Sequence, residues 1–332
     1  MWMAFRCLQG NRTFALYDEP SKNSSSRVAA GLYNPVLSKR QKLSFNASAI
    51  YPPLGRRYQV LEQHLGEKVC HHLHTAYILE SLRELNDWAA LSESKWFSDF
   101  VQLKNERISD HILSDFGYLD IQDSGWVDIP KMLNAFVARI QAPSLYVQEH
   151  FDADALISRD GGFEYKGIEA EHIVFCQGTG ISTNPITAGI RLKPAKGEIL
   201  NIEADDRVEG LVPQNGVFML PLGHDTFRVG SNFTWEDLST ESTEAARNEI
   251  VQKFTRWYKG PFHIASQVAG VRPSSLDRRP LLGRLDFHPN AFLLNGFGSK
   301  GVSHAPHYSE MLYRLIYEDK LVDRDIDVKR FI

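Results

Sequence analysis

The residues best suited to chemistry lie in two C-terminal segments, Gly270–Gly283 and Asn295–Val302. The second segment contains a glycine-rich stretch, Gly296-Phe297-Gly298-Ser299-Lys300-Gly301, between a predicted strand and a predicted helix. A turn of this kind directs free backbone N–H groups and the positive end of a helix dipole toward a ligand. We therefore expect an electron-rich group to bind at this turn.

Asp18 is a candidate for binding a nucleotide ribose, because it directly follows the apolar run Thr13–Tyr17. In a dinucleotide-binding fold, an acid at the C-terminal tip of the second strand accepts hydrogen bonds from ribose hydroxyls. The alternative is a strand-ending turn, for which Asp-x-Pro is a common sequence. The glycine fingerprint of such folds precedes the acid by about 20 residues, and only 17 residues precede Asp18. We expect the chain as given to be truncated at its N-terminus, and to bind a dinucleotide poorly unless an upstream extension is restored.

A third candidate segment, Ser24–Pro35, combines hydroxyl-bearing and small residues. Small residues let backbone N–H groups approach an anion and let a flat ring lie against the main chain. The alternative is a flexible serine linker followed by a turn. That alternative accounts for Ser24–Ser26 but not for the stretch Ala29-Ala30-Gly31-Leu32 that follows.

Composition and charge limit the class of protein. The chain has 332 residues, 43% hydrophobic and 23% charged, a length typical of about two globular domains. Its net charge of −4 provides no overall basic field for nucleic acid, although a local basic patch stays open. No stretch reaches the ~18–20 apolar residues of a membrane span, and the three cysteines form neither a disulfide framework nor a metal-ligand pattern. We expect a cytoplasmic protein that holds no metal.

Hydrophobic periodicity predicts helix–strand units at both chain ends around an antiparallel middle. The run 13–17 is typical of a buried strand in a covered sheet. Residues 191–202 and 217–234 alternate apolar and polar types, which predicts an antiparallel sheet with one wet face. Trp235 is expected to fill a domain seam, and residues 323–330 to form a solvated tail. The other predicted elements are helices at 1–9, beginning near 58, ending near 88, after an N-cap at Asp128, at 241–258 and at 302–317, with strands at 69–79, 144–147, 163–166, 172–176, 264–270 and 291–295.

Taken in order, these segments resemble the FAD-dependent D-amino-acid oxidase superfamily, which includes glycine oxidases, sarcosine oxidases and the flavin domain of the bifunctional enzyme that modifies the tRNA wobble uridine. The ordered set carries the resemblance, and it extends over nearly the whole chain. The main matches are Ser25–Pro35, Gly270-x-Arg272-Pro273 with Asp277 and Pro280–Gly283, and the Gly296–Gly301 turn with Ala305-Pro306. The weaker matches are Val127–Pro130, Phe175–Gly178 and Pro194–Glu198.

The resemblance implies an α/β fold with an FAD-binding Rossmann-like layer of the glutathione-reductase type and an inserted antiparallel-sheet substrate domain. The FAD-binding domain would be discontinuous and would comprise residues 1–45, 125–185 and 265–332. It would lack the N-terminal strand and its GxGxxG loop. The substrate domain would comprise residues 46–124 and 186–264.

The resemblance also implies a role for each candidate residue. Arg272 would grip a substrate carboxylate, for which its planar fork is suited; the alternative is that it pairs with Asp277 or another acid. Lys300 would stabilise negative charge on reduced flavin; the alternative is a solvated lysine in a surface turn. FAD would be held by Asp18 at the ribose, by Ser24, Ser25 and Ser26 near the pyrophosphate, by Ala30, Gly31 and Leu32 behind the isoalloxazine, by Gly178, and by Gly298, Ser299, Lys300 and Gly301 at the flavin pyrimidine edge.

The implied activity is that of an FAD-dependent amino-acid or amine oxidase or dehydrogenase. It would oxidise the C–N bond of a small amine or amino acid by hydride transfer to flavin, with O₂ or a quinone as acceptor. Two alternatives stay open. One is a flavin domain that acts on the carboxymethylaminomethyl group of a tRNA nucleoside, whose head resembles glycine. The other is a non-catalytic remnant of the fold that cannot hold FAD.

Overall fold

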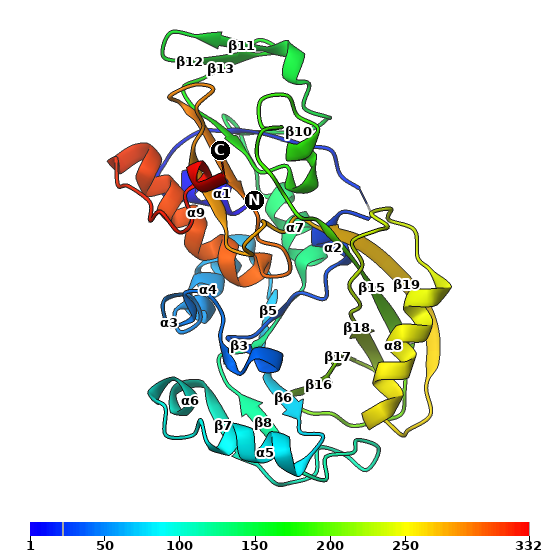
Figure 1. The fold of residues 1–332 in the computed structure, drawn as a ribbon. Coiled ribbons are helices and arrows are strands. Elements are labelled where there is room, and N and C mark those ends of the chain that lie inside the picture. The colour runs from blue at the N-terminus through cyan, green and yellow to red at the C-terminus, as the bar shows by residue number, and fades with distance from the viewer. Residues whose placement is uncertain (22, 332) are drawn as a thin grey trace.

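The computed structural model describes residues 1–21 and 23–331. In the view of Figure 1, both chain ends lie together in the upper part of the molecule, and the largest sheet lies below and to the right. The helices are α1 (Trp2–Gln9), α2 (Ser25–Val28), α3 (Ala47–Ile50), α4 (Leu54–Leu65), α5 (Leu82–Ala89), α6 (Lys95–Phe100), α7 (Ile129–Ala138), α8 (Glu244–Trp257) and α9 (Gly301–Glu318).

Two small sheets form the part built from both chain ends. Strand β1 (Ala15–Asp18) pairs in parallel with β10 (Leu145–Gln148), and β14 (Ile173–Phe175) pairs in parallel with β21 (Ala291–Asn295), which also pairs with β20 (Leu281–Arg284). These strands confirm the helix–strand start and the strands predicted at 144–147, 172–176 and 291–295. The prediction that the run 13–17 is a buried strand is wrong, because Ala15 is exposed and Leu16 and Tyr17 are only half-buried. Within the described residues β1 has a single neighbouring strand, β10, so its other edge is left open.

The large sheet has eight strands within the described residues, and most of its neighbouring pairs are antiparallel. This confirms the predicted antiparallel middle. Its order is β19 (His263–Arg272), β15 (Ala195–Glu203), β18 (Thr226–Gly230), β17 (Val217–Gly223), β16 (Leu211–Asn215), β6 (His74–Ile78), β8 (Tyr118–Ile121) and β7 (Val101–Lys104).

The other strands form small separate sheets, of which β11–β12–β13 lies at the top of the molecule in Figure 1. Strand β5 (Cys70–His72) and β6 belong to different sheets, so the single strand predicted at 69–79 is two strands. The remaining strands are β2 (Leu32–Tyr33), β3 (Val36–Leu37), β4 (Lys42–Leu43), β9 (Gly125–Val127), β11 (Leu156–Arg159), β12 (Gly162–Tyr165) and β13 (Ile168–Ala170).

Strand β15 is covered on both faces, so the prediction of one wet face is wrong for this part of the sheet. Leu200 and Ile202 pack with Ile250 and Phe254 of α8, whereas Ile199 packs with Ala30 on the opposite face. Alternate residues of a strand point to opposite faces. The polar residues between the apolar ones are therefore buried as well: Lys196 is 0% and Glu198 1% exposed.

The helical core joins the N-terminus to the C-terminal helix. Trp2 of α1 packs edge-on against Tyr58 of α4, with ring centroids 5.3 Å apart. The Tyr58 hydroxyl donates a hydrogen bond to the Val302 carbonyl at the start of α9. Asp128 caps α7 by accepting a hydrogen bond from the Lys131 amide, which confirms the predicted N-cap. Of the described helices, none combines the length and the apolar character that crossing a membrane demands.

Two further predictions are wrong in detail. The C-terminal segment is docked and is not a solvated tail, because Ile326 and Val328 are 1% and 0% exposed, and Ile326 accepts a hydrogen bond from Leu282 of β20. Apolar residues alternate with charged residues in this segment, and burial of the apolar ones holds the segment against the fold. Trp235 does not fill a seam: it is 51% exposed on the loop between β18 and α8.

We predict that His304 of α9 makes the protein less stable as pH falls. His304 is 2% exposed, and burial, with Lys300 and His307 nearby, lowers its pKa to about 3. An unfolded histidine has a pKa of about 6.5, so below that pH the unfolded chain binds a proton that the folded chain does not. The free energy of unfolding should therefore fall by about 2 kcal/mol between pH 7 and pH 5 on account of this residue.

Denaturant unfolding from pH 7.5 to pH 4.5 measures this loss. The variant His304→Gln should show a shallower decrease than the wild type, whereas His263→Gln, at an exposed position on β19, should follow the wild type. Parallel curves for the wild type and His304→Gln would contradict the assignment.

Candidate functional site

Several of the predicted site residues meet around the end of β19, whereas Asp18 lies at the end of β1. A β-carbon at Gly270 would lie 3.2 Å from Cβ of Val28 and 3.5 Å from Cα of Ser25, so α2 and β19 are in close contact. The Gly298 amide donates to the Pro273 carbonyl at 3.2 Å. The side-chain amide of Asn295 donates to the Gly178 carbonyl at 2.8 Å. The serine segment, Gly178, Arg272 and the Gly298 turn are therefore brought together, although they are far apart in the sequence.

The Ala29–Leu32 segment is held against β9. Gly31 has φ +79°, and a β-carbon there would overlap the Val127 carbonyl oxygen, so the position requires glycine. The Gly31 carbonyl accepts a hydrogen bond from the Val127 amide at 3.0 Å. Ala30 is buried and Leu32 is half-buried. On this side the partner of the small residues is the protein backbone, so the predicted approach of an anion or a flat ring to this segment stays a prediction.

Asp18 lies exposed at the carboxyl end of β1, in register with Gln148 of β10. Its carboxylate accepts a hydrogen bond from the Tyr146 hydroxyl at 3.2 Å. Within the described residues it caps no backbone N–H, so the turn-cap alternative finds no contact there. Ligands of open α/β sheets bind beyond the carboxyl ends of the strands. A cavity of about 230 Å³ lies in that position beyond β10 and β14, lined by His150, Phe151 and Gln177 among others.

The start of α9 presents free hydrogen-bond donors. Within the described chain the amides of Gly301 and Val302 donate to no acceptor, and a β-carbon at Gly301 would meet open space. Lys300 is half-buried, and its ammonium donates to the Tyr51 hydroxyl at 3.5 Å. Lys300 is therefore not a fully solvated lysine. The turn places a cation and a helix N-terminus side by side.

Arg272 is half-buried at the end of β19, and burial lowers its pKa to about 10. Its guanidinium donates to the Lys196 carbonyl at 3.0 Å, to the Ser231 hydroxyl at 2.8 Å and to the Asn232 carbonyl at 3.4 Å. Among the described residues no carboxylate lies within ion-pair distance of it. The alternative pairing with Asp277 is not formed, because Asp277 pairs with Arg330 at 3.0 Å.

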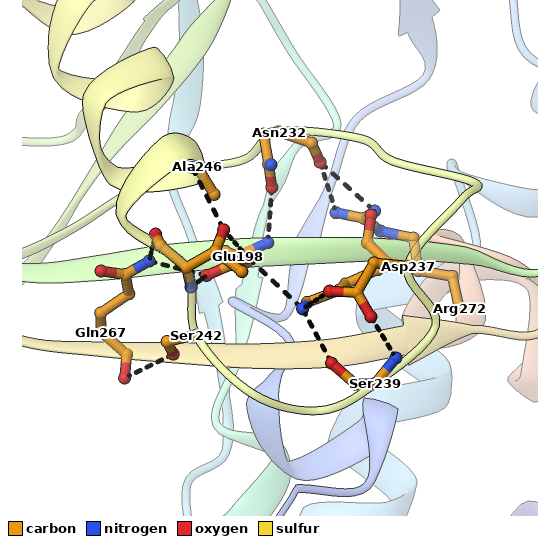
Figure 2. A network of polar contacts seen from close by, with 10 residues as sticks. Glu198, Asn232, Asp237, Ser239, Ser242, Ala246, Gln267 and Arg272 are labelled. Atoms are coloured by element: carbon orange, nitrogen blue, oxygen red, sulfur yellow. Dashed lines mark hydrogen bonds and ion pairs between the residues drawn. The ribbon is translucent and has the colours of Figure 1, made fainter.

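A network of charges beside Arg272 was missed by the sequence analysis (Figure 2). The buried ammonium of Lys196 contacts Asp237 at 2.5 Å and Glu198 at 3.7 Å. Glu198 accepts hydrogen bonds from the amide and hydroxyl of Thr243, both at 2.9 Å, and from Gln267 at 2.6 Å. Lys196 lowers the pKa of the Asp237 carboxyl to about 2. The alternating pattern of 191–202 gave no signal that these charges are buried.

The two faces of β15 carry different groups. Lys196 and Glu198 point to the face covered by α8, together with Leu200. Gly197 points to the opposite face, where a β-carbon would overlap the Arg272 guanidinium. Arg272 therefore lies on the same face of the sheet as Ile199 and Ala30, and it occupies the space that Gly197 leaves open.

This combination of parallel strands ending in an acid, small residues against the main chain and a helix N-terminus beside a cation is typical of dinucleotide-binding enzymes. The family model described as "FAD dependent oxidoreductase" matches residues 3–315, and the chain belongs to this family. The family is FAD-dependent, and its α/β fold with a Rossmann-like layer is the fold that the resemblance implied.

Solved structures share this fold. Glycine oxidase from Geobacillus kaustophilus superimposes with a TM-score of 0.80 at 18% identity, over 99% of this chain and 94% of that one. Iminodiacetate oxidase from Chelativorans sp. BNC1 gives 0.77 at 17% identity, over 98% and 95%. L-proline dehydrogenase from P. horikoshii gives 0.79 at 14% identity, over 99% and 94%.

Curated relatives are longer proteins. The tRNA 5-methylaminomethyl-2-thiouridine biosynthesis bifunctional protein MnmC of Shewanella amazonensis is 22% identical over an alignment of 243 residues, and the match covers 60% of this chain and 36% of that protein. MnmC of Azoarcus sp. is 25% identical over an alignment of 248 residues, with 63% of this chain and 38% of that protein covered. The chain thus spans less than two fifths of the length of these relatives.

The residues described fit FAD at both ends of the cofactor. The exposed Asp18 carboxylate suits ribose hydroxyls. The free amides of Gly301 and Val302, with Lys300, suit the electron-rich edge of a flavin ring. The open side of Gly178, whose β-carbon would meet only Pro273 at 3.9 Å, leaves room for a ligand.

We predict that Asp18→Ala weakens FAD binding by about 1–3 kcal/mol, the range for losing a hydrogen bond to a charged group. Titration of the flavin-free protein with FAD, followed by flavin fluorescence, measures the affinity. Glu19→Ala removes a charge of the same sign one residue away and should leave the affinity near that of the wild type. If Asp18→Ala binds FAD as the wild type does, Asp18 has no part in the ribose site.

Proposed function

We propose that this FAD-dependent oxidoreductase oxidises the C–N bond of an amino acid or a related amine that carries a carboxylate, and that Arg272 binds that carboxylate. Electrons would pass from the flavin to O₂ or a quinone. We further propose that residues 1–45, 125–185 and 265–332 form the FAD-binding domain and residues 46–124 and 186–264 the substrate domain. Strand β19 would begin in the proposed substrate domain and end, at Arg272, in the proposed FAD-binding domain.

The observation that carries the proposal is that Arg272 lacks a carboxylate partner among the described residues. A buried charge is strongly destabilising unless an opposite charge or several hydrogen bonds compensate it. Here the hydrogen bonds to neutral oxygens and the ring of Phe233, 4.1 Å from the guanidinium, compensate the positive charge only in part, because none of these groups is an anion. A substrate carboxylate would supply the missing negative charge, and it would replace the two long contacts to the Asn232 carbonyl, both 3.4 Å, with charge-assisted hydrogen bonds.

Each of the other residues has a separate part in the proposed reaction. Bound FAD supplies the hydride acceptor. Arg272 orients the substrate by its carboxylate, and Phe233 keeps water from one face of the guanidinium. Lys300 and the N-terminus of α9 provide positive potential for the FAD ring, with Asp18, Ser24–Ser26, Ala30–Leu32, Gly178, Gly298 and Ser299 as the remaining cofactor contacts.

A second candidate substrate is a carboxymethylaminomethyl group on a tRNA nucleoside. The names of the two curated relatives support it, whereas the net charge of −4 does not favour a nucleic-acid partner. Its glycine-like head would use Arg272 in the same way. Anaerobic flavin reduction by free glycine-like amines, compared with reduction by modified tRNA, separates the two substrates, and a purified protein without flavin absorbance would indicate a non-catalytic remnant.

We predict that Arg272→Lys and Arg272→Met lower kcat/KM by about 30-fold to several thousand-fold, with Arg272→Met the more severe. Lysine keeps the charge but loses the bidentate fork, and methionine loses both. Leaving a desolvated carboxylate without its partner costs roughly 2–5 kcal/mol. Flavin content should stay normal, because the guanidinium contacts Lys196, Ser231 and Asn232 and none of the residues assigned to FAD.

Anaerobic flavin reduction by a panel of glycine-like amines and D-amino acids measures the effect, with flavin spectrum and melting temperature recorded for each variant. Arg256→Met, at an exposed position on α8, is the matched control and should behave as the wild type. A variant of Arg272 that reduces its flavin at the wild-type rate with an active substrate would refute the carboxylate assignment.

We predict that Gly197→Ala lowers kcat/KM roughly hundredfold without removing any charge, the loss expected for misplacing a binding group by about 1 Å. The new β-carbon would overlap the Arg272 guanidinium and displace it. Gly189→Ala is the control, since a β-carbon there meets no atom within 4 Å. Equal activity of Gly197→Ala and Gly189→Ala, with both proteins holding flavin, would show that the position of Arg272 does not matter.

A further inference from the structure

The loop Ser231–Ser239, which follows β18 and precedes α8, exposes two aromatic side chains beside Arg272. Phe233 is 50% and Trp235 51% exposed, and their rings stack with centroids 6.4 Å apart at 26°. Single exposed apolar residues are common, but a stacked pair next to a buried cation is a feature that binding sites use. Phe233 also covers one face of the Arg272 guanidinium at 4.1 Å. The aromatic pair therefore begins at the proposed carboxylate site and extends outward from it.

The 231–239 loop is tied to β15 along its length. The backbones of Thr234 and Lys196 exchange two hydrogen bonds, at 2.9 and 3.2 Å. The side chain of Asn232 accepts from the Glu198 amide at 2.8 Å. Figure 2 shows Asp237 and Ser239 turned toward the same point, which is the Lys196 ammonium. The aromatic pair thus lies between two attachments to a single strand.

Asp237 attaches the far end of the 231–239 loop to β15 through its side chain. Its side chain is 45% exposed, whereas the Lys196 ammonium that it contacts is fully buried. It also accepts a hydrogen bond from the Ser239 amide at 2.8 Å, which fixes the turn of the loop after Trp235. Without Asp237, residues 235–239 would keep one hydrogen bond to β15 among the described residues, from the Lys196 ammonium to the Ser239 hydroxyl at 3.3 Å.

We infer that Phe233 and Trp235 determine substrate specificity, that they favour substrates carrying an apolar or aromatic group beside the carboxylate, and that Asp237 is the positioning residue that holds them there through Lys196. This inference rests on the proposed function, because it takes Arg272 as the carboxylate site. A phenyl group lying against the two rings would remove apolar surface from water on both partners. A small carboxylate such as acetate would gain nothing from them.

The test compares the binding of phenylacetate and acetate to the full chain by calorimetric titration. We expect the wild type to bind phenylacetate at least about tenfold more tightly than acetate, from the burial of one ring. Trp235→Ala should abolish this preference and leave the affinity for acetate unchanged. Asp237→Ala should abolish the preference as well. Asp237→Glu should restore it, because it returns the carboxylate to Lys196. Glu236→Ala, which removes an exposed neighbouring acid, should keep the preference.

The outcomes distinguish this inference from the proposed function. If both acids bind, and Arg272→Met abolishes their binding, but Trp235→Ala keeps the full preference for phenylacetate, the specificity role is refuted and the carboxylate site stands. If neither acid binds to the wild type, or Arg272→Met binds both as before, the proposed function fails and this inference with it. Should Asp237→Ala fail to fold, Trp235→Ala decides the specificity role. Asp237→Asn, which keeps the shape of the side chain but removes its charge, then decides the positioning role: it should lose the preference that Asp237→Glu keeps, and an unchanged preference would refute that role.

Discussion

The pairing of one fully buried ammonium, that of Lys196, is the interaction on which the proposed substrate side of this molecule depends. A lysine charge removed from water requires nearby negative charge, and both Glu198 and Asp237 are used for it. Arg272 lies on the neighbouring strand, paired one position away with Ala195. It is left with neutral oxygens as its partners. The distribution of two acids over two cations therefore leaves one cation for a ligand.

The same network determines where α8 begins. Glu198 accepts from the amide and hydroxyl of Thr243, and the Thr243 hydroxyl in turn accepts from the Ala246 amide in the first turn of the helix. The helix that covers one face of β15 is thus attached to a carboxylate of that strand. Since Glu198 lies between the Lys196 ammonium and the N-cap of α8, and the ammonium holds the loop that precedes α8, these elements stabilise one another.

How much the sequence predicted depends on how local each contact is. The Gly298–Gly301 turn and the Asp128 cap are formed by residues within a few positions of one another, so their patterns were readable and are confirmed. The Lys196–Asp237 contact joins residues 41 positions apart, and alternation alone predicted that Lys196 faces water. Burial of β15 results from α8 and Ala30 together, which no pattern within residues 191–202 contains. The exposure of β1 could not be predicted for the same reason, because an apolar run does not show which elements will pack against it.

The two sides of the site also differ in the chemistry by which they bind. The proposed cofactor side consists mainly of backbone N–H groups and of residues that are small because larger ones would collide, such as Gly31 against Val127. Such requirements act on residue type directly, and they leave glycine and serine patterns in the sequence. The substrate side consists of long side chains whose charge is set by partners on other strands, and an arginine in a sequence looks the same whether it is paired or free. Gly197 belongs to both sides of this comparison. It must be small because the Arg272 guanidinium lies over it. The Lys-Gly-Glu order of β15 therefore places two paired ions on one face and leaves room for an unpaired ion on the other.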